Sequence, residues 1–399
     1  MGNQYAASGI VRHFPHVAAG FIAVLVGYTS SAAIVFQAAH AAGATPSQLA
    51  SWLWALGLGM GVTCIALSLR YRAPILTAWS TPGAALLATG LVGVPMREAI
   101  GAFLFASVLM AVLGFSGGFE RIMRHVPPSL SAAMLAGILL RFGLGAFSML
   151  GNNLALVGTM IVVFFAARRL WPRYAVPLAF LAGLVVAAAS GSIATGEIRW
   201  QLSAPELMMP GFSFATLIGV GLPLFVVTLA TQNVPGLAVL RANGYATPAS
   251  PLLGWTGVTG VTGVVLAPFG GFSFNLAAIT AAICMSRDAD PDPARRYLAA
   301  VWAGGFYLLT GIGGATVASL LSAFPQALVV AIAGLALLGT IAGSLTTALA
   351  HEEERDAAVV TFLVTASGLT LFGIGSAFWG LVFGYAVSHA LRRPRKVAA

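Results

Sequence analysis

Charged residues are scarce in this chain of 399 residues: Asp, Glu, Lys and Arg make up 8% of it, whereas 59% is hydrophobic. Soluble globular domains do not have this composition. Apolar runs recur from Val17 almost to the C-terminus, and no stretch between them is polar enough to form a separate soluble domain. We therefore expect one polytopic membrane domain over residues 1–399, beginning with a transmembrane helix and not with a cleaved signal peptide.

Cysteine is nearly absent, and so are the sequence motifs of enzymes. Cys64 and Cys284 both lie in apolar segments, so the sequence predicts neither a disulfide framework nor a cysteine metal site. The six histidines lie near the ends of apolar segments, and no two have zinc-binding spacing. The chain has no nucleophile elbow, Walker loop or HExxH motif. We expect no enzymatic activity, no metal and no cofactor.

Acidic residues are also few, and all eleven fall in loops or at the ends of apolar runs. The absence of a carboxylate at mid-membrane argues against a cation pump and against a nucleobase site read by buried carboxylates. It favours an anionic substrate. It also leaves proton coupling without an evident proton-binding group on the protein.

The apolar runs predict an all-α protein with fourteen transmembrane segments. They begin near Val17, Ser47, Pro74, Glu98, Ser129, Leu154, Tyr174, Phe214, Leu252, Leu266, Leu298, Gln326, Ala357 and Ser376. With both termini in the cytoplasm, 17 of the 20 Arg and Lys residues fall on the cytoplasmic side, as the positive-inside rule requires. Membrane orientation therefore explains the net charge of +9, and nucleic acid is not expected as a partner.

An inverted repeat is predicted by the odd number of segments on each side of the polar connection 191–211. The two repeats cover about residues 16–191 and 211–391, with seven segments each, so their orientations are opposite. The stretch PPSLSAAMLAGILLRFG from Pro127 resembles FPQALVVAIAGLALLGT from Phe324, which aligns Pro128 with Pro325 and Gly137 with Gly334. A second match aligns TPGAA from Thr81 with FNLAA from Phe274.

Segments three and ten are interrupted, which is the pattern of a transporter's substrate site. In APILTAWSTPGAALLATG, from Ala73, and LAPFGGFSFNLAAITAAIC, from Leu266, a few extended residues precede a short helix. We expect these half-helices to begin at Pro82 and near Asn275, and the extended pieces to pair as short strands. A helix that begins at mid-membrane presents free N–H groups and partial positive charge, which an anion satisfies. The two helix N-termini are expected to converge on the substrate.

Polar side chains in two further segments are candidates for the same site. The first segment carries Tyr28 and Ser31 in GYTSSAAIVFQAA, and the alternative is that its hydroxyls bond their own helix. The eighth ends in TLATQNVPG, where Gln232 and Asn233 bind substrate or cap the interface. Arg141 lies about 20 Å into its helix. It is either a counter-charge for a carboxylate substrate or a structural arginine.

Several long motifs resemble the benzoate/proton symporter family of bacterial inner membranes. The resemblance runs from about Gly20 to Gly384 and is carried by GYTSSAAIVFQAA, LTAWSTPGAALL, SAAMLAGILLRFG, AAITAAIC and ERDAAVVTFLVTASGLTLFGIGSAFWG. It implies import of benzoate or a related aromatic carboxylate by proton symport, with alternating access of a site between a core and a gate subdomain. It also implies distant kinship with nucleobase-ascorbate and sulfate transporters, which have seven plus seven segments in an inverted repeat.

The chain departs from the nucleobase relatives at the site itself. Those proteins place glutamates in the eighth and tenth segments, where this chain has residues such as Thr231, Gln232 and Phe272. Only positions carry over, and the implied substrate-binding residues are Tyr28, Ser31, Ser80, Thr81, Gly83, Gln232, Asn233, Ser273, Phe274 and Asn275, with Trp79 and Phe272 as further aromatic wall. We expect the carboxylate between residues 81–84 and 273–277 and the ring on aromatic side chains.

Two alternative functions remain open. One is an inorganic-anion transporter or exchanger of the same architecture, similar to those for sulfate; the other is a membrane scaffold or an embedded enzyme. Interrupted helices disfavour a scaffold, and the missing catalytic motifs disfavour an enzyme. The expected partners are the aromatic acid, protons, the lipid bilayer of the inner membrane and a second copy in a homodimer.

Overall fold

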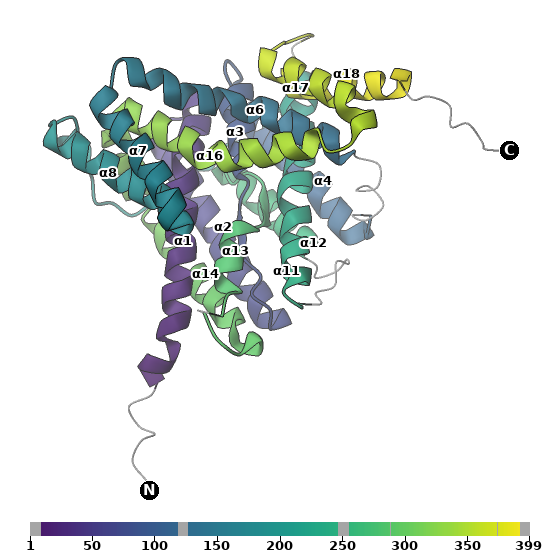
Figure 1. The fold of residues 1–399 in the computed structure, drawn as a ribbon. Coiled ribbons are helices and arrows are strands. Elements are labelled where there is room, and N and C mark those ends of the chain that lie inside the picture. The colour runs from purple at the N-terminus through teal and green to yellow at the C-terminus, as the bar shows by residue number, and fades with distance from the viewer. Residues whose placement is uncertain (1–8, 119–126, 246–254, 288, 373, 392–399) are drawn as a thin grey trace, which may run out of the picture.

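The computed structural model describes residues 9–118, 127–245, 255–287, 289–372 and 374–391. Within these ranges the chain is mostly helical and contains a two-stranded ribbon (Figure 1). The first half forms α1 (Gly9–Ala41), α2 (Pro46–Tyr71), β1 (Thr77–Trp79), α3 (Thr81–Gly90), α4 (Met96–Ser116), α6 (Pro128–Ser148), α7 (Leu154–Leu170) and α8 (Ala175–Ala189). The second half forms α9 (Phe214–Thr216), α10 (Leu222–Thr228), α11 (Val234–Ala242), α12 (Trp255–Leu266), β2 (Phe274–Leu276), α13 (Ile279–Cys284), α14 (Tyr297–Ile312), α15 (Gly314–Ala323), α16 (Gln326–Ala348), α17 (Arg355–Ser367) and α18 (Ser376–Leu391).

These helices are typical of a polytopic membrane protein, but not all of them are long enough to cross a bilayer. Five described helices are long and apolar enough to span it, and up to seven if each bent pair is one span. The bent pairs are the two parts of α1, at 42°, and α14 with α15, at 68°. The count of fourteen spans therefore stays a prediction, and Leu252, where the ninth is expected to begin, lies outside the described residues.

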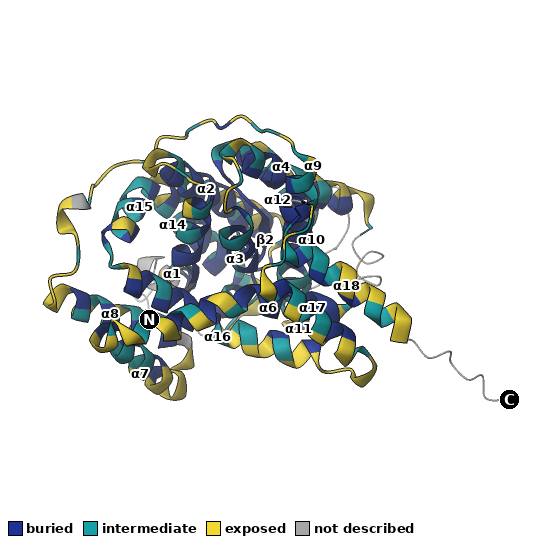
Figure 2. Ribbon diagram, turned by 90° about the horizontal axis from the view of Figure 1, so that it is seen from above, coloured by how far each residue is buried: buried dark blue, intermediate teal, exposed yellow. Residues whose placement is uncertain are grey.

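The helices form two groups that pack against each other. The first, here called the ribbon bundle, contains the ribbon with α1–α4 and α9–α15; the second, the flanking bundle, contains α6–α8 and α16–α18. Both views show this division, with α6 and α16 lying across the end of the ribbon bundle (Figures 1 and 2). Buried positions concentrate in the ribbon bundle, whereas α7, α8 and α18 expose much of their surface (Figure 2). The exposed side chains on α7 include Leu154, Val162 and Phe165, as expected for a helix that faces lipid.

Helix pairings within each half of the chain have counterparts in the other half. The contact of α2 with α14 corresponds to that of α12 with α4, and the contact of α7 with α8 corresponds to that of α17 with α18. The offset from Thr77 to Phe274, where the strands begin, is 197 residues, and so is the offset from Pro128 to Pro325. The predicted match of Thr81 with Phe274 is wrong by four residues, because Thr81 begins a helix while Phe274 begins a strand.

Close helix packing depends on glycines at the contacts. A Cβ on Gly57 of α2 would lie 2.4 Å from the Gly311 Cα of α14, and a Cβ on Gly334 of α16 would lie 2.3 Å from the Phe142 carbonyl of α6. Small residues allow membrane helices to approach until their backbones touch, which increases dispersion contacts where lipid provides no hydrophobic driving force. Gly137 and Gly334 are separated by the same 197 residues, and they lie on the two long helices α6 and α16, which pack together.

The predicted eighth segment is one helical run, residues 214–241, with two wider π-helical turns. These turns cover Leu217–Gly221 and Leu229–Asn233, and each ends two residues before a proline, Pro223 or Pro235. Because proline has no N–H, the carbonyl four residues earlier lacks its usual donor and the turn widens. The second of these turns carries the candidate residues Gln232 and Asn233.

Candidate substrate site

The two interrupted segments pair with each other at the centre of the ribbon bundle. Strands β1 and β2 are antiparallel, with Ala78 opposite Asn275, and the Ser80 N–H extends the ladder to the Ser273 carbonyl at 3.1 Å. At the other end the Ala277 N–H donates to the Leu76 carbonyl at 2.9 Å. The predicted strand pairing is confirmed. Non-helical backbone within a membrane domain is tolerated where protein surrounds it, and these strands are surrounded by protein.

Side chains from α2 and the eighth segment satisfy the outer edges of the ribbon. On β1, the Thr77 N–H donates to Cys64 Sγ and the Trp79 N–H to Met60 Sδ, both at 3.1 Å. On β2, the Leu276 N–H donates to Asn233 Oδ1 at 2.9 Å. All of these residues are buried, so the bonds replace those that water would otherwise make. Asn233 therefore holds the ribbon, and its neighbour Gln232 is half-buried without a hydrogen bond to any described residue.

The short helix α3 begins at Thr81, one residue before the predicted start at Pro82. Ser80 is its N-cap, and the Ser80 hydroxyl accepts from the Gly83 N–H at 2.9 Å. Because Pro82 has no N–H, Thr81 carries the remaining first-turn donor, and it has no acceptor among the described residues. Gly83 packs closely, since a Cβ there would lie 2.8 Å from Leu224 Cδ1.

The second half-helix begins later than predicted. Asn275 lies in the middle of β2, and α13 starts only at Ile279, so the predicted start near Asn275 is wrong. The strand continues because Asn233 and the Leu76 carbonyl supply partners for its N–H groups. The start of α13 lies beyond the Ala277 end of the ribbon, about 13 Å along it from Ser80. The two helix N-termini therefore do not converge on one point.

Three candidates on β2 and its approach have different surroundings. Ser273 has a positive φ of 49°, and its hydroxyl lies 2.6 Å from the Thr228 hydroxyl of α10. The Phe274 ring packs against Gly59 of α2, which leaves no room for a Cβ there. The Asn275 Nδ2 donates to the Leu276 carbonyl, while its fully buried Oδ1 has no partner among the described residues.

The first helix attaches to the ribbon through an aromatic cluster. The Trp79 Nε1–H donates to the Ser31 hydroxyl at 2.8 Å, and that hydroxyl donates to the Gly27 carbonyl of its own helix. The Tyr28 ring meets the Trp79 ring edge-on, with centroids 4.8 Å apart. Tyr28 and Ser31 are thus brought together with β1, whereas the neighbouring Thr29 hydroxyl bonds back to the Leu25 carbonyl.

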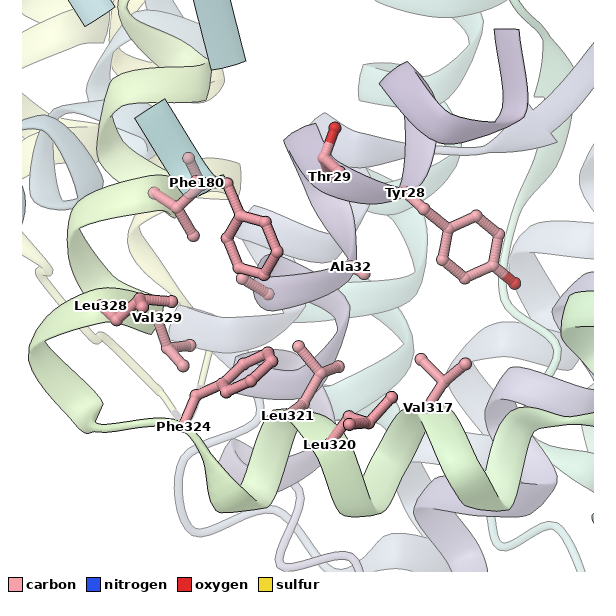
Figure 3. A pocket seen from close by; sticks show the side chains of 12 residues that line it. Tyr28, Thr29, Ala32, Phe180, Val317, Leu320, Leu321, Phe324, Leu328 and Val329 are labelled. Carbon is pink, nitrogen blue, oxygen red and sulfur yellow. The ribbon is translucent and has the colours of Figure 1, made fainter. Parts of the chain in front are cut away.

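A cavity of about 180 Å³ opens on the other side of Tyr28, between the two bundles. Figure 3 shows side chains from four helices around it, with Phe180 and Phe324 opposite α1. The lining is almost entirely apolar and comprises Tyr28, Thr29, Ala32, Ala33, Phe180, Val317, Leu320, Leu321, Phe324, Leu328, Val329 and Ile332. Apart from Tyr28, these residues could not be predicted as a site from the sequence, because isolated apolar side chains on separate helices resemble ordinary core.

Arg141 lies apart from the other candidates. It lines a larger cavity, of about 330 Å³, at the C-terminal end of α3, where Thr89 and Gly90 also face it. The N-terminal end of α3, with Ser80 and Thr81, is about 14 Å away along the helix. The structure therefore does not place Arg141 beside the ribbon.

A hydrogen-bonded pair of a buried histidine and a partly buried aspartate connects the start of α1 with the segment after α13. His16 Nε2 lies 2.8 Å from Asp290 Oδ2, and Arg295 Nε lies 3.8 Å from the same oxygen. Burial by itself raises the pKa of Asp290, but hydrogen bonds from the Asp292 N–H and from His16, together with the charge of Arg295, lower it below its ordinary value. Arg296 completes the junction by donating to three backbone carbonyls of this segment, including that of Met285.

Comparison with known proteins places this architecture in a family. Residues 11–390 match the family described as Benzoate membrane transport protein. The chain belongs to this family. The benzoate membrane transport protein of Acinetobacter baylyi (strain ATCC 33305 / BD413 / ADP1) is 36% identical over 377 residues, which are 94% of this chain and 95% of that protein. Inner membrane protein YdcO of Escherichia coli (strain K12) is 54% identical over 370 residues, 93% of this chain and 94% of that protein.

Solved structures with low sequence identity share the fold of this benzoate transport family member. SLC26A9 matches with a TM-score of 0.60 and 13% identity, over 96% of this chain and 66% of that one. The transmembrane domain of the cyanobacterial bicarbonate transporter BicA matches with a TM-score of 0.55 and 13% identity, over 94% and 97%. The protein is therefore a membrane transporter of the benzoate type, not an enzyme, and it has the transporter fold of these anion carriers.

Proposed function

We propose that the protein imports benzoate or a related aromatic carboxylate across the bacterial inner membrane by proton symport. Family membership and the name of the Acinetobacter relative support the substrate class. The observation that carries the proposal is the apolar cavity beside Tyr28. A dry cavity of about 150 Å³ lined by Leu, Ile and Phe binds benzene. The cavity here, of about 180 Å³, has the size and the lining for one aromatic ring.

The carboxylate is proposed to bind where Tyr28 meets the ribbon. The free Thr81 N–H and the positive end of the α3 dipole attract an anion there. Ser273 and Asn275 add polar atoms, of which the unpartnered Asn275 Oδ1 can accept a hydrogen bond from a protonated carboxyl group. Gly83 and Phe274 shape this region by packing, and Ser31 positions Trp79.

Transport is proposed to proceed by alternating access, with the ribbon bundle as the core and the flanking bundle as the gate. Support comes from the position of the apolar cavity beside Tyr28, here called the ring cavity. Its lining includes α1 of the ribbon bundle and α8 and α16 of the flanking bundle. The matched pairings in the two halves support the inverted repeat of seven plus seven segments. The excess of Arg and Lys on one side of the predicted segments supports cytoplasmic termini. The homodimer remains an expectation from related architectures.

An inorganic-anion transporter or exchanger is the second candidate. It is favoured by the solved structures with this fold, which include murine Slc26a9, an anion transporter, and BicA, a bicarbonate transporter. Aromatic acids should compete for uptake only if the ring cavity is part of the site. Inhibition of uptake by sulfate or bicarbonate, without inhibition by aromatic acids, would favour this candidate instead.

Filling the ring cavity tests the proposal. Val317→Phe adds an aromatic ring to the lining, so labelled benzoate uptake into proteoliposomes should fall to background. Val162→Phe makes the same exchange on α7 at a side chain that is 69% exposed and does not line the cavity, and it should leave uptake unchanged. Equal folded yield of the two variants controls for misfolding. Wild-type KM and rate in Val317→Phe would remove the cavity from the site.

A further inference from the structure

The cavity around Arg141 has the properties of a separate carboxylate site. With a volume of about 330 Å³, it falls within the range of small-molecule pockets. Its lining mixes apolar side chains with the hydroxyl residues Thr89, Thr216, Thr370 and Ser376. The ring cavity, in contrast, is almost purely apolar. The Arg141 cavity can therefore accommodate a charged group together with a ring, whereas the ring cavity fits the ring alone.

Arg141 has no hydrogen bond or ion pair with any described residue. Its guanidinium instead lies against Gly368, where a Cβ would be 2.1 Å from Nη2. Glu98 accepts a hydrogen bond at Oε2 from the hydroxyl of Thr216, a lining residue, at 2.6 Å. Glu98 and Arg141 do not form an ion pair with each other. A guanidinium offers a planar set of donors that matches a carboxylate in bidentate fashion. Arg141 is exposed in the structure, and an unpaired arginine inside a membrane protein is tolerated where it faces water or an anionic ligand.

The position of this cavity indicates when a ligand would occupy it. It lies between α3 and the π-helical turn of the eighth segment on one side, and α6, α17 and α18 on the other. Motion of the two bundles against each other would therefore change its shape. In the predicted orientation α3 runs from mid-membrane toward the outside, so the cavity lies on the side from which substrate arrives.

We propose that the Arg141 cavity is a second binding site, which captures the carboxylate of the incoming aromatic acid before it reaches the ribbon. This inference rests on the proposed function for its ligand, an aromatic monocarboxylate. The Arg141 guanidinium binds the carboxylate. The absence of a Cβ at Gly368 leaves room for that guanidinium at the cavity wall.

Protection of an engineered cysteine tests occupancy of the site directly. Thr370 lines the cavity and is exposed, while the native Cys64 and Cys284 are fully buried. Thr370→Cys in the full-length purified protein should react with a maleimide, and benzoate should slow the reaction whereas neutral benzamide should not. Adding Arg141→Gln should abolish the protection, and Arg141→Lys, which keeps the charge without the bidentate fork, should restore part of it.

Transport kinetics provide the second readout. Arg141→Gln should raise the KM for benzoate about tenfold or more, the loss expected for a hydrogen bond to a charged group. The matched control is Arg199→Gln, which removes one exposed positive charge on the same predicted side without touching the cavity.

The outcomes separate this inference from the proposed function. Benzoate transport without protection of Thr370→Cys, or with an unchanged KM in Arg141→Gln, would overturn the capture site and leave the proposed function intact. Arginine-dependent protection without any benzoate transport would retain the site and remove the proposed function. Neither protection nor transport would overturn both.

Discussion

Replacing Asn233 with leucine removes the side chain that completes the outer edge of β2. Its Oδ1 accepts the Leu276 N–H at 2.9 Å, and both residues are buried, so the substitution leaves that N–H without a partner. An unsatisfied buried donor costs about 1–3 kcal/mol. Leucine has the same number and branching of side-chain heavy atoms as asparagine and is the larger residue, so none of the effect should come from a cavity. At roughly 2 °C per kcal/mol for a long chain, the unfolding midpoint should fall by about 2–6 °C.

Thermal unfolding of the purified protein in mild detergent, followed by tryptophan fluorescence, measures this effect. The matched control is Gln232→Leu, one residue away in the same π-helical turn, which breaks no hydrogen bond with a described residue and should stay within about 0.5 kcal/mol of wild type. Equal midpoints for the two variants would refute the role of Asn233 in holding the ribbon. A loss of benzoate binding in Asn233→Leu at an unchanged midpoint would instead assign Asn233 to the substrate.

Further substitutions test neighbouring features by the same unfolding measurement. Ser80→Ala removes the N-cap of α3 and should cost about 1 kcal/mol, whereas Ser80→Thr should retain most of the stability; equal loss in both would contradict capping. Gly59→Ala places a Cβ 2.3 Å from the Phe274 ring and should cost about 1–3 kcal/mol, and an unchanged midpoint would show that the ring moves freely. Because the pKa of Asp290 is lowered in the folded protein, its carboxylate stabilises the fold above the ordinary Asp pKa of about 3.9, and this contribution is lost as the pH falls below that value. Asp290→Asn should flatten that acid-side decrease, and an identical pH profile would refute the role of the pair with His16.

The interrupted segments could be predicted from sequence because local chemistry fixes them. Pro82 cannot donate to a preceding turn, and Ser80 supplies a cap at the right spacing, so α3 begins within one residue of the expected start. The start of α13 could not be predicted in this way. Asn275 is compatible with a helix start, and it lies in a strand only because Asn233, more than 40 residues away in the sequence, accepts the neighbouring N–H.

The candidate site was predictable only where residues carry an unusual polar group. Tyr28 and Ser31 were identified because hydroxyls are rare in apolar segments, and the structure places them against Trp79. The ring cavity was not, because Phe180 and Phe324 become neighbours only when α8 and α16 pack beside α1. The position of Arg141 away from the ribbon depends likewise on the tertiary packing of α6 against α3 and α17, which no local pattern encodes.

Accumulation of labelled benzoate in proteoliposomes that contain the purified protein most directly tests proton-coupled import. The measurement compares a pH gradient, acidic on the side of uptake, with no gradient, and uses liposomes without protein to subtract passive entry. We predict accumulation above equilibrium only when protein and gradient are both present, with Val317→Phe at the background level. Equilibration of benzoate that ignores the gradient would contradict proton symport, and the absence of any benzoate uptake would contradict the proposed substrate.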